Sequence, residues 1–129
     1  MKKAAPRCFP VLPFIILSLS FATLAQADAR GEQEVRHLLD YIAGSGCTFI
    51  RNGDEHTAQK AREHMEYKYG FGKPWIDDGD DFIERIATES STSGEKYTIR
   101  CQGRTEFTGE WLKAELERYR AQQAPAASR

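Results

Sequence analysis

The chain has 129 residues, of which 40% are hydrophobic and 29% are charged, with 18 Lys and Arg against 19 Asp and Glu. A chain of this size can form one domain with a real but modest core. The balanced charge and the lack of a basic run disfavour nucleic-acid binding, which needs a dense positive surface.

The first 27 residues have the three-part pattern of a secretory signal peptide. Three basic residues come first, an apolar stretch runs from Phe9 to Leu24, and Ala25-Gln26-Ala27 has the small-x-small spacing of a cleavage site. An uncleaved anchor is the alternative, but two prolines interrupt a run that is short of the roughly 20 apolar residues of a spanning helix. We expect cleavage near Ala27 and a periplasmic or secreted mature protein without a membrane span. Its 102 residues would carry a net charge of −4.

Cys8 leaves with the signal peptide, so the mature chain carries two cysteines, Cys47 and Cys101. An even count in an oxidising compartment predicts a disulfide between them. Closing so long a loop stabilises the fold by about 4 kcal/mol if the effect is loop entropy alone. Two buried free thiols, or a metal site completed by histidines, are the alternatives, although two widely spaced cysteines are weak grounds for zinc.

The first two elements of the mature chain are predicted from their apolar patterns. Hydrophobic residues at helical spacing predict a helix from near Gly31 to Gly44. The β-branched and aromatic segment 47–51 predicts a short strand, which Asn52-Gly53-Asp54 ends. Asn52 or Asp54 is then expected to cap a second helix that runs to about Tyr69.

The second half is predicted to repeat this mixture of helix and strand. Glycines and a proline predict a loop over 70–75, and Asp80 or Asp81 is expected to open a third helix that carries Phe82, Ile83, Ile86 and Ala87. Residues 96–101 alternate like a strand, and Thr108 is expected to cap a last helix that carries Trp111, Leu112, Leu116 and Tyr119. The sequence thus predicts a helix-rich α+β domain over 28–121, with about four helices and a two-stranded antiparallel sheet. A disordered tail is expected over 122–129, and no internal repeat is visible.

Two histidines of the second helix, His56 and His64, are the first candidates for chemistry. They are eight residues apart, or roughly 12 Å along a straight helix, so they cannot share one metal ion. The interpretation that we favour for His64 is a histidine at the core edge that is bonded to a carboxylate or a carbonyl. The run from Ser90 to Gly94 could supply a nucleophile with His64 as its base, but hydroxyl-rich runs more often form turns.

Two further clusters have both a functional and a structural interpretation. The four carboxylates of 77–81 could bind calcium weakly, but they lack the EF-hand register, and helix capping explains them more simply. The aromatic stretch around Tyr69, Phe71 and Trp75 could form a binding surface if it were exposed, although packing over the core is the simpler interpretation.

Several motifs of the chain form a recognisable set. They are Ser45-Gly46-Cys47-x-Phe49-Ile50-Arg51-Asn52-Gly53, His56-x-Ala58-x-x-Ala61-x-x-His64-x-x-x-Lys68-Tyr69, Phe82-Ile83-x-x-Ile86-Ala87, Ser90-Ser91-x-Ser93-Gly94-x-x-Tyr97 and Trp111-Leu112. Together they resemble a family of small exported proteobacterial proteins classed as a domain of unknown function (DUF5329-like), over residues 34–120. The resemblance implies an exported single domain and no particular activity.

The polar residues of these motifs come from three segments that a compact fold could bring together. We predict that they form one polar network beside the disulfide: Arg51, Asn52, His56, His64, Lys68, Ser90, Ser91, Ser93 and Tyr97. No cofactor or metal ion is expected. The leading interpretation is a non-enzymatic binding or interaction module for an envelope protein, peptide or glycan. The alternative is a small serine hydrolase that uses a serine of 90–93 with His64.

Overall fold

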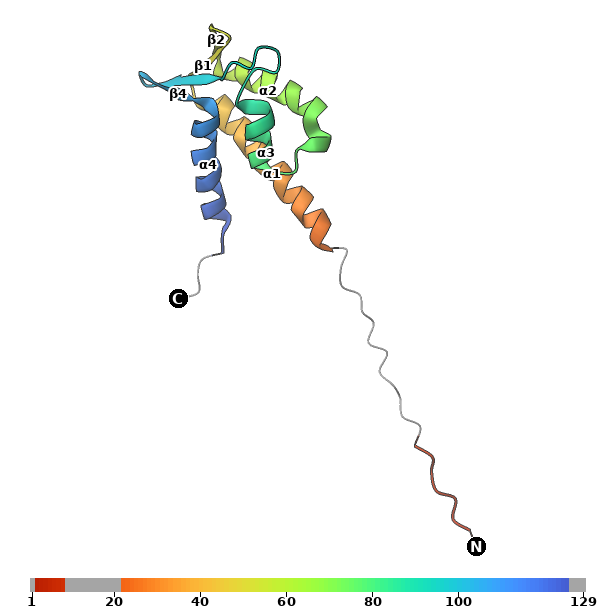
Figure 1. Cartoon of the computed structure of the whole chain (residues 1–129). Coiled ribbons are helices and arrows are strands. Elements are labelled where there is room, and N and C mark those ends of the chain that lie inside the picture. The colour runs from red at the N-terminus through yellow and green to blue at the C-terminus, as the bar shows by residue number, and fades with distance from the viewer. Residues whose placement is uncertain (1, 9–21, 126–129) are drawn as a thin grey trace.

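The structure, a computed structural model, describes residues 2–8 and 22–125 (Figure 1), so residues 9–21 of the predicted signal peptide, most of its apolar stretch, lie outside the described residues. The helices of the described part are α1 (Ala22–Gly44), α2 (Ala58–Gly72), α3 (Gly79–Phe82) and α4 (Thr108–Gln123). The strands are β1 (Thr48–Arg51), β2 (Asp54–Thr57), β3 (Thr98–Cys101) and β4 (Arg104–Phe107). A 3₁₀ turn η1 (Lys73–Trp75) follows α2, and a π-helical turn η2 (Ile83–Ala87) continues α3. The predicted helix-rich α+β class is confirmed.

The sheet has four strands rather than the predicted two. Its order is β2-β1-β3-β4, and each neighbouring pair is antiparallel. The predicted strands are the central pair, and each continues into an edge strand through a two-residue turn. In Asn52-Gly53 and in Gln102-Gly103 both residues have positive φ, which is the type I′ geometry that joins hairpin strands tightly. The Asn-Gly pair therefore makes a hairpin, where we had expected the chain to enter a helix.

This hairpin moves the start of the second helix. Residues 54–57 form β2, so α2 begins at Ala58, and its cap is Thr57 rather than Asn52 or Asp54. The Thr57 hydroxyl accepts a hydrogen bond of 3.2 Å from the Lys60 backbone N–H. At its other end α2 continues through much of the predicted loop, as far as Gly72.

The other helices also differ from the prediction at their ends. α1 begins at Ala22, within a run of good helix formers, and so extends through the predicted cleavage site. Asp78, rather than Asp80 or Asp81, caps α3 by accepting a hydrogen bond of 3.0 Å from the Asp81 N–H. The cap position of α4 is Phe107, not Thr108. α4 then includes Gln122 and Gln123, the first two residues of the predicted tail. Residues 126–129 of that tail lie outside the described residues.

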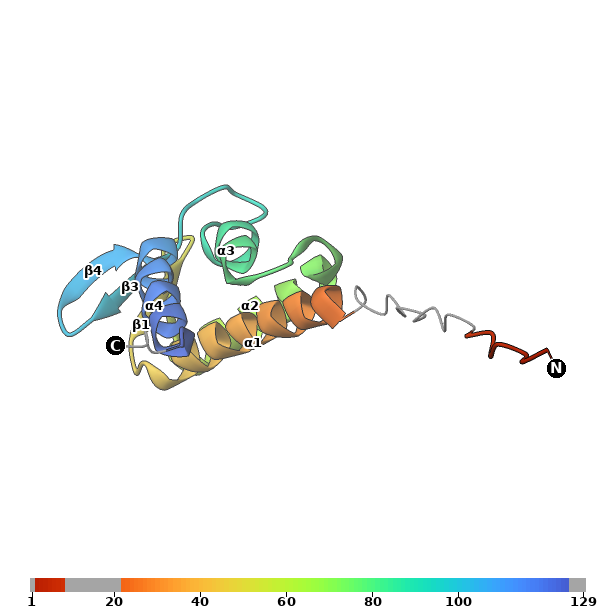
Figure 2. The same ribbon diagram turned by 90° about the horizontal axis from the view of Figure 1, so that it is seen from below.

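The helices lie on one side of the sheet, and the outer ends of α1 and α4 point away from it (Figures 1 and 2). Most residues of the apolar stripes predicted for the helices are buried, together with Phe49 of β1 and Ile99 of β3. Tyr69, Trp111 and Tyr119 of these stripes are only partly buried. The core residues are Val35, Leu38, Leu39, Ile42, Phe49, Ala58, Ala61, Met65, Ile76, Phe82, Ile83, Ile86, Ala87, Tyr97, Ile99, Leu112 and Leu116. None of the helices in the described ranges is long and apolar enough to cross a bilayer.

A repeat that the sequence does not reveal organises the sheet. β1, β2 and α2 form a hairpin followed at once by a helix, and β3, β4 and α4 form the same unit 50 positions later. Phe49 pairs with Ile99, its own equivalent, in the antiparallel β1–β3 ladder. A local twofold axis therefore passes through this pair. Continuing the same register by two residues brings Cys47 opposite Cys101 at one end of the ladder and Arg51 opposite Tyr97 at the other.

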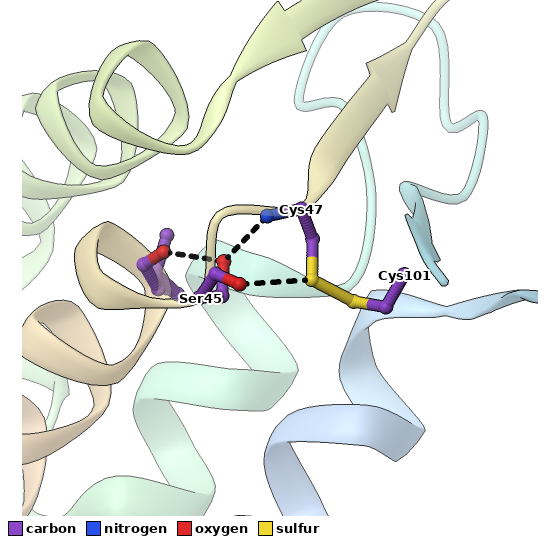
Figure 3. Close-up of a disulfide and its surroundings, with 4 residues drawn as sticks. Ser45, Cys47 and Cys101 are labelled. Carbon is purple, nitrogen blue, oxygen red and sulfur yellow. Dashed lines mark hydrogen bonds between the residues drawn. A yellow bond between two sulfur atoms is a disulfide. The ribbon is translucent and has the colours of Figure 1, made fainter. Parts of the chain in front are cut away.

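The predicted disulfide between Cys47 and Cys101 is confirmed, with a Cα–Cα distance of 4.8 Å (Figure 3). Ser45 holds the chain between α1 and this bond. Its hydroxyl donates to the Ile42 carbonyl at 2.8 Å and accepts from the Cys47 N–H at 3.3 Å. The crosslink thus fixes one end of the β1–β3 ladder to the end of α1.

Candidate functional site

A pocket of about 320 Å³ lies between β1, β2 and α2, near the end of the β1–β3 ladder that is opposite the disulfide. Its volume is at the lower limit of sites that bind small molecules. The apolar part of its lining comes from Phe49, Ile50, Ala61 and Met65. The polar part comes from Arg51, His56, Lys60, Glu63, His64, Tyr67 and Tyr97.

The repeat gives this pocket a smaller counterpart in the second unit. Ala61 of α2 corresponds to Trp111 of α4, since each is eight residues beyond the glycine of its hairpin turn. The indole of Trp111 packs edge-on against Phe49 at 5.9 Å and stacks on Tyr41 at 4.5 Å, measured between ring centroids. On α2 the small Ala61 lines the larger pocket together with Phe49. The equivalent positions of the second unit, among them Ile99 and Trp111, line a smaller pocket of about 210 Å³.

Arg51 and His64 form the closest polar contact of the pocket. Nη1 of Arg51 is 2.8 Å from both ring nitrogens of His64. A guanidinium can only donate hydrogen bonds, so the ring nitrogen that accepts carries no proton, and the imidazole is neutral in this arrangement. Burial lowers the pKa of His64 first, and the positive charges of Arg51 and Lys68 lower it further.

Tyr97 and Lys68 lie behind this pair. The Tyr97 hydroxyl is 3.4 Å from Nε2 of His64 and 3.4 Å from Nζ of Lys68, and the tyrosine is almost fully buried. Lys68 also donates to two carbonyls, that of Ile86 in η2 at 2.9 Å and that of Glu89 just after η2 at 3.2 Å. Burial lowers the pKa of Lys68, with Arg51 acting in the same direction, and burial raises the pKa of Tyr97.

The hydroxyl-rich turn forms a second, separate group of hydrogen bonds. The Ser93 hydroxyl donates to Oδ1 of Asn52 at 2.6 Å, and the Asn52 amide donates to the Ser90 hydroxyl at 3.4 Å. Ser93 Oγ also accepts from the Glu95 N–H at 3.2 Å, and so closes its own turn. Within the described residues no serine of this turn is hydrogen-bonded to His64. These hydrogen bonds join the turn to the β1–β2 hairpin, so their role is to stabilise the fold.

The predicted polar network is therefore divided in two. The structure brings together Arg51, His64, Lys68 and Tyr97, and separately Asn52, Ser90 and Ser93. His56 lines the pocket, where its Nε2 is buried without a hydrogen-bond partner among the described residues, and Ser91 is exposed. The expectation that the network lies beside the disulfide is wrong, because the two occupy opposite ends of the β1–β3 ladder.

The aromatic stretch does not pack over the core as a whole, which was the simpler interpretation, nor does it form one exposed surface. Phe71 and Trp75 are about two-thirds exposed, but Tyr69 is half-buried and packs edge-on against Phe82 of the core. Tyr67, also exposed, takes its place by packing against Phe71 at 4.9 Å between ring centroids. Because Tyr67 lines the pocket, this aromatic pair extends from the pocket mouth along α2.

The acidic segment 77–81 caps a helix and pairs with Arg120. Asp78 is the cap of α3, and Oδ2 of Asp80 accepts a hydrogen bond of 2.7 Å from Nη1 of Arg120. Arg120 is also bidentate with Glu34, with both hydrogen bonds 2.8 Å long. No group of three or more His, Cys, Asp or Glu side chains within the described ranges could hold a metal ion.

The sequence interpretation missed two buried carboxylates between α1 and α4. Glu34 accepts from Arg120 and from the Gly79 N–H, and Glu115 contacts His37 at 2.6 Å. Hydrogen bonds from Arg120 keep the pKa of Glu34 below its usual value. Burial raises the pKa of Glu115, but hydrogen bonds from Arg118 and His37 outweigh it and keep this pKa low as well. Their burial could have been inferred from their positions in the helices. Glu34 is four residues before Leu38, and Glu115 precedes Leu116, so both lie on buried helix stripes.

Fold and site together define a small, disulfide-linked α+β domain with a partly apolar pocket of about 320 Å³ at one end of the β1–β3 ladder. The chain belongs to the family of unknown function DUF5329, whose family model matches residues 29–120. Neither the search of the curated proteins nor the search of the solved structures finds a match. Membership in this family assigns no reaction, so the function has to be argued from the pocket.

Proposed function

We propose that the protein is a non-enzymatic binding module, exported to the periplasm or secreted, that receives part of an envelope protein, peptide or glycan in the pocket between β1, β2 and α2. The signal-peptide pattern of residues 1–27 supports export. The disulfide is compatible with the oxidising compartment that export would reach.

The observation that carries this proposal is a pocket that combines unfilled apolar surface with unsatisfied polar atoms. Phe49 and Ala61 belong to its apolar lining, and Nε2 of His56, which also lines it, is buried without a partner in the described residues. A buried polar atom without a hydrogen bond costs about 1–3 kcal/mol. A ligand that bonds to His56 and covers Phe49 would recover part of this cost.

The hydrolase alternative has less support from the same geometry. A serine nucleophile needs a base within hydrogen-bond reach, at roughly 3 Å. The described contacts of His64 are with Arg51 and Tyr97, and those of Ser90 and Ser93 are with Asn52 and their own turn. The arrangement thus fits recognition better than acyl transfer.

The proposal is tested by mapping ligand fragments on the mature protein, residues 28–129, by amide and methyl NMR. A set of neutral, cationic and anionic aromatic fragments should shift resonances around Phe49, Ala61 and Met65. Ala61→Trp should remove these shifts, because it places on α2 the indole that α4 carries. The matched control is Ala114→Trp on the exposed face of α4.

Two outcomes would contradict the proposal. One is that no fragment of any charge shifts the pocket resonances of the folded protein. The other is covalent labelling of a serine of 90–93 by a serine-directed phosphonate, with loss of that labelling in His64→Ala, which would establish the hydrolase. If Ala61→Trp does not fold, as judged by its circular dichroism, Ala61→Leu serves as a milder filling of the same space.

A further inference from the structure

We infer that the ligand of this pocket is an organic carboxylate with a short apolar body, its carboxylate held by Arg51 and its body against Phe49, Ala61 and Met65. The inference rests on the proposed function and specifies the chemical class of the ligand. It follows from the charges of the pocket, from the shape of its polar end and from the protonation of His64.

The pocket has positive charge that its own carboxylates do not balance. Lys60 pairs with Glu63 at 2.9 Å, which leaves Arg51 in the lining and Lys68 behind it. Among the described residues, neither of these two cations has a carboxylate oxygen within 4.0 Å. Asp54 is opposite Arg51 in the hairpin register but forms no such contact, and Glu89 acts on Lys68 only from a longer range.

Half-buried cations without a counterion are uncommon, because their desolvation has to be offset by an opposite charge or by good hydrogen bonds. Lys68 meets this need with two backbone carbonyls. Within residues 2–8 and 22–125, the hydrogen-bond partner of the Arg51 guanidinium is the neutral ring of His64, so most of its donors stay available. A guanidinium fork matches the two oxygens of a carboxylate and binds them with charge-assisted hydrogen bonds.

The remaining lining decides against a bare inorganic anion. Phe49, Ile50, Ala61 and Met65 form one wall, and Tyr67 lies at the mouth. A volume of about 320 Å³ has room for a carboxylate with a body the size of one aromatic side chain. Two sources share this chemistry: a free aromatic or aliphatic acid, and the C-terminus of a peptide that ends in an apolar residue.

Binding of a carboxylate would also change the protonation of His64. The groups that face this ring are Arg51 from β1, His56 from β2, Tyr97 before β3, and Lys68 and Glu63 from α2, with Glu89 beyond Lys68. The cations among them favour the neutral ring. A carboxylate placed beside Arg51 reverses this balance, so the pKa of His64 should rise in the complex. At pH values above about 4, where the carboxyl group of the ligand stays ionised, affinity should rise as the pH is lowered and fall as the pH rises through the pKa of His64 in the bound state.

The test is NMR titration of the mature protein, labelled at histidine, with four probes. They are 3-phenylpropionate, its neutral amide, phenethylamine and inorganic phosphate, and the source is resolved by comparing N-acetyl-Ala-Phe that has a free C-terminus with its C-terminal amide. We expect the acids to bind at the pocket at least tenfold more tightly than their amides, the amine and phosphate. The His64 pKa should rise on binding.

Variants separate the role of Arg51 from general effects of charge. Arg51→Gln should weaken 3-phenylpropionate binding at least tenfold, and Arg51→Lys, which keeps the charge but loses the fork, should give an intermediate loss. The matched control is Arg104→Gln on β4, an exposed cation outside the pocket, which should change affinity less than twofold.

The failures of the two proposals are distinguishable. If the acid and its amide bind in the pocket with equal affinity, if phosphate binds as well as 3-phenylpropionate, or if folded Arg51→Gln binds normally, the carboxylate class is wrong and the binding module stands. If none of the probes binds in the pocket of the folded protein, both proposals are wrong.

Discussion

The two ends of the β1–β3 ladder are related by a local twofold axis but have opposite chemistry. At one end Cys47 and Cys101 are covalently joined, and Trp111 of α4 packs on Phe49 beside a small pocket of about 210 Å³. At the other end Arg51 and Tyr97 occupy the equivalent positions, and Ala61 of α2 leaves a pocket. One backbone arrangement, used twice, thus provides a closed end that stabilises the fold and an open end that can receive a ligand.

The comparison indicates how a domain of about 100 residues can accommodate unsatisfied polar groups. A small core leaves little free energy in reserve. The free energy of stabilisation from the crosslink at the closed end offsets the cost of incomplete packing and unbalanced charge at the open end. On this account, changes at the closed end affect stability most, and changes at the open end affect binding most.

The largest effect is expected from loss of the crosslink. Replacing both cysteines by serine (Cys47→Ser with Cys101→Ser) should lower the free energy of unfolding by about 2–5 kcal/mol. The reason is that the unfolded chain gains conformational freedom when two residues 54 positions apart are no longer crosslinked. Urea denaturation of the oxidised wild type and the double variant measures this difference. A loss below about 1 kcal/mol would mean that the closed end does not anchor the fold.

The next largest effect is expected from opening the closed end. Trp111→Ala removes the indole that packs on Phe49 and Tyr41, and should cost about 3 kcal/mol in the free energy of unfolding. Ala61→Ser at the equivalent position of α2 should cost less than 1 kcal/mol. Equal losses for the two variants in urea denaturation would break the proposed asymmetry between the ends.

The smallest effect is a pH dependence at the open end. Because the pKa of His64 is lower in the folded protein than in the unfolded chain, the folded state favours the neutral ring. This contribution to stability is complete above the unfolded value of 6.5 and is lost as the pH falls through the folded pKa. When the pH is lowered from 7.5 to 5.5, the melting temperature of His64→Gln should therefore fall less than that of the wild type. Identical pH profiles in thermal denaturation would show that burial and Arg51 do not act on this ring.

Much of the fold was predictable because the helices carry clear apolar stripes. The stripes from Val35 to Ile42 and from Phe82 to Ala87 are buried as predicted. The edge strands were missed because β2 and β4 carry no apolar alternation: Asp54-Glu55-His56-Thr57 and Arg104-Thr105-Glu106-Phe107 are largely polar. Their only sequence signal was the pair of X-Gly turns, of which Asn52-Gly53 was the stronger.

The candidate site was predictable in its members but not in its grouping. Arg51, His64, Lys68 and Tyr97 meet as expected. Their separation from the serine turn depends on the hairpin register, which no local pattern determines. The pocket itself depends on a comparison between Ala61 and Trp111 that becomes meaningful only when the repeat is seen. Buried Glu34 and Glu115 were missed because charged residues are seldom assigned to a core.

The most direct test of the account is the location of bound 3-phenylpropionate on the mature protein, determined by intermolecular nuclear Overhauser effects. We predict contacts from its ring to Phe49, Ala61 and Met65 at the open end, and none to Trp111 at the closed end. Contacts centred on Trp111, or the absence of any localised contact at saturating ligand, would contradict the assignment of recognition to the open end of the ladder.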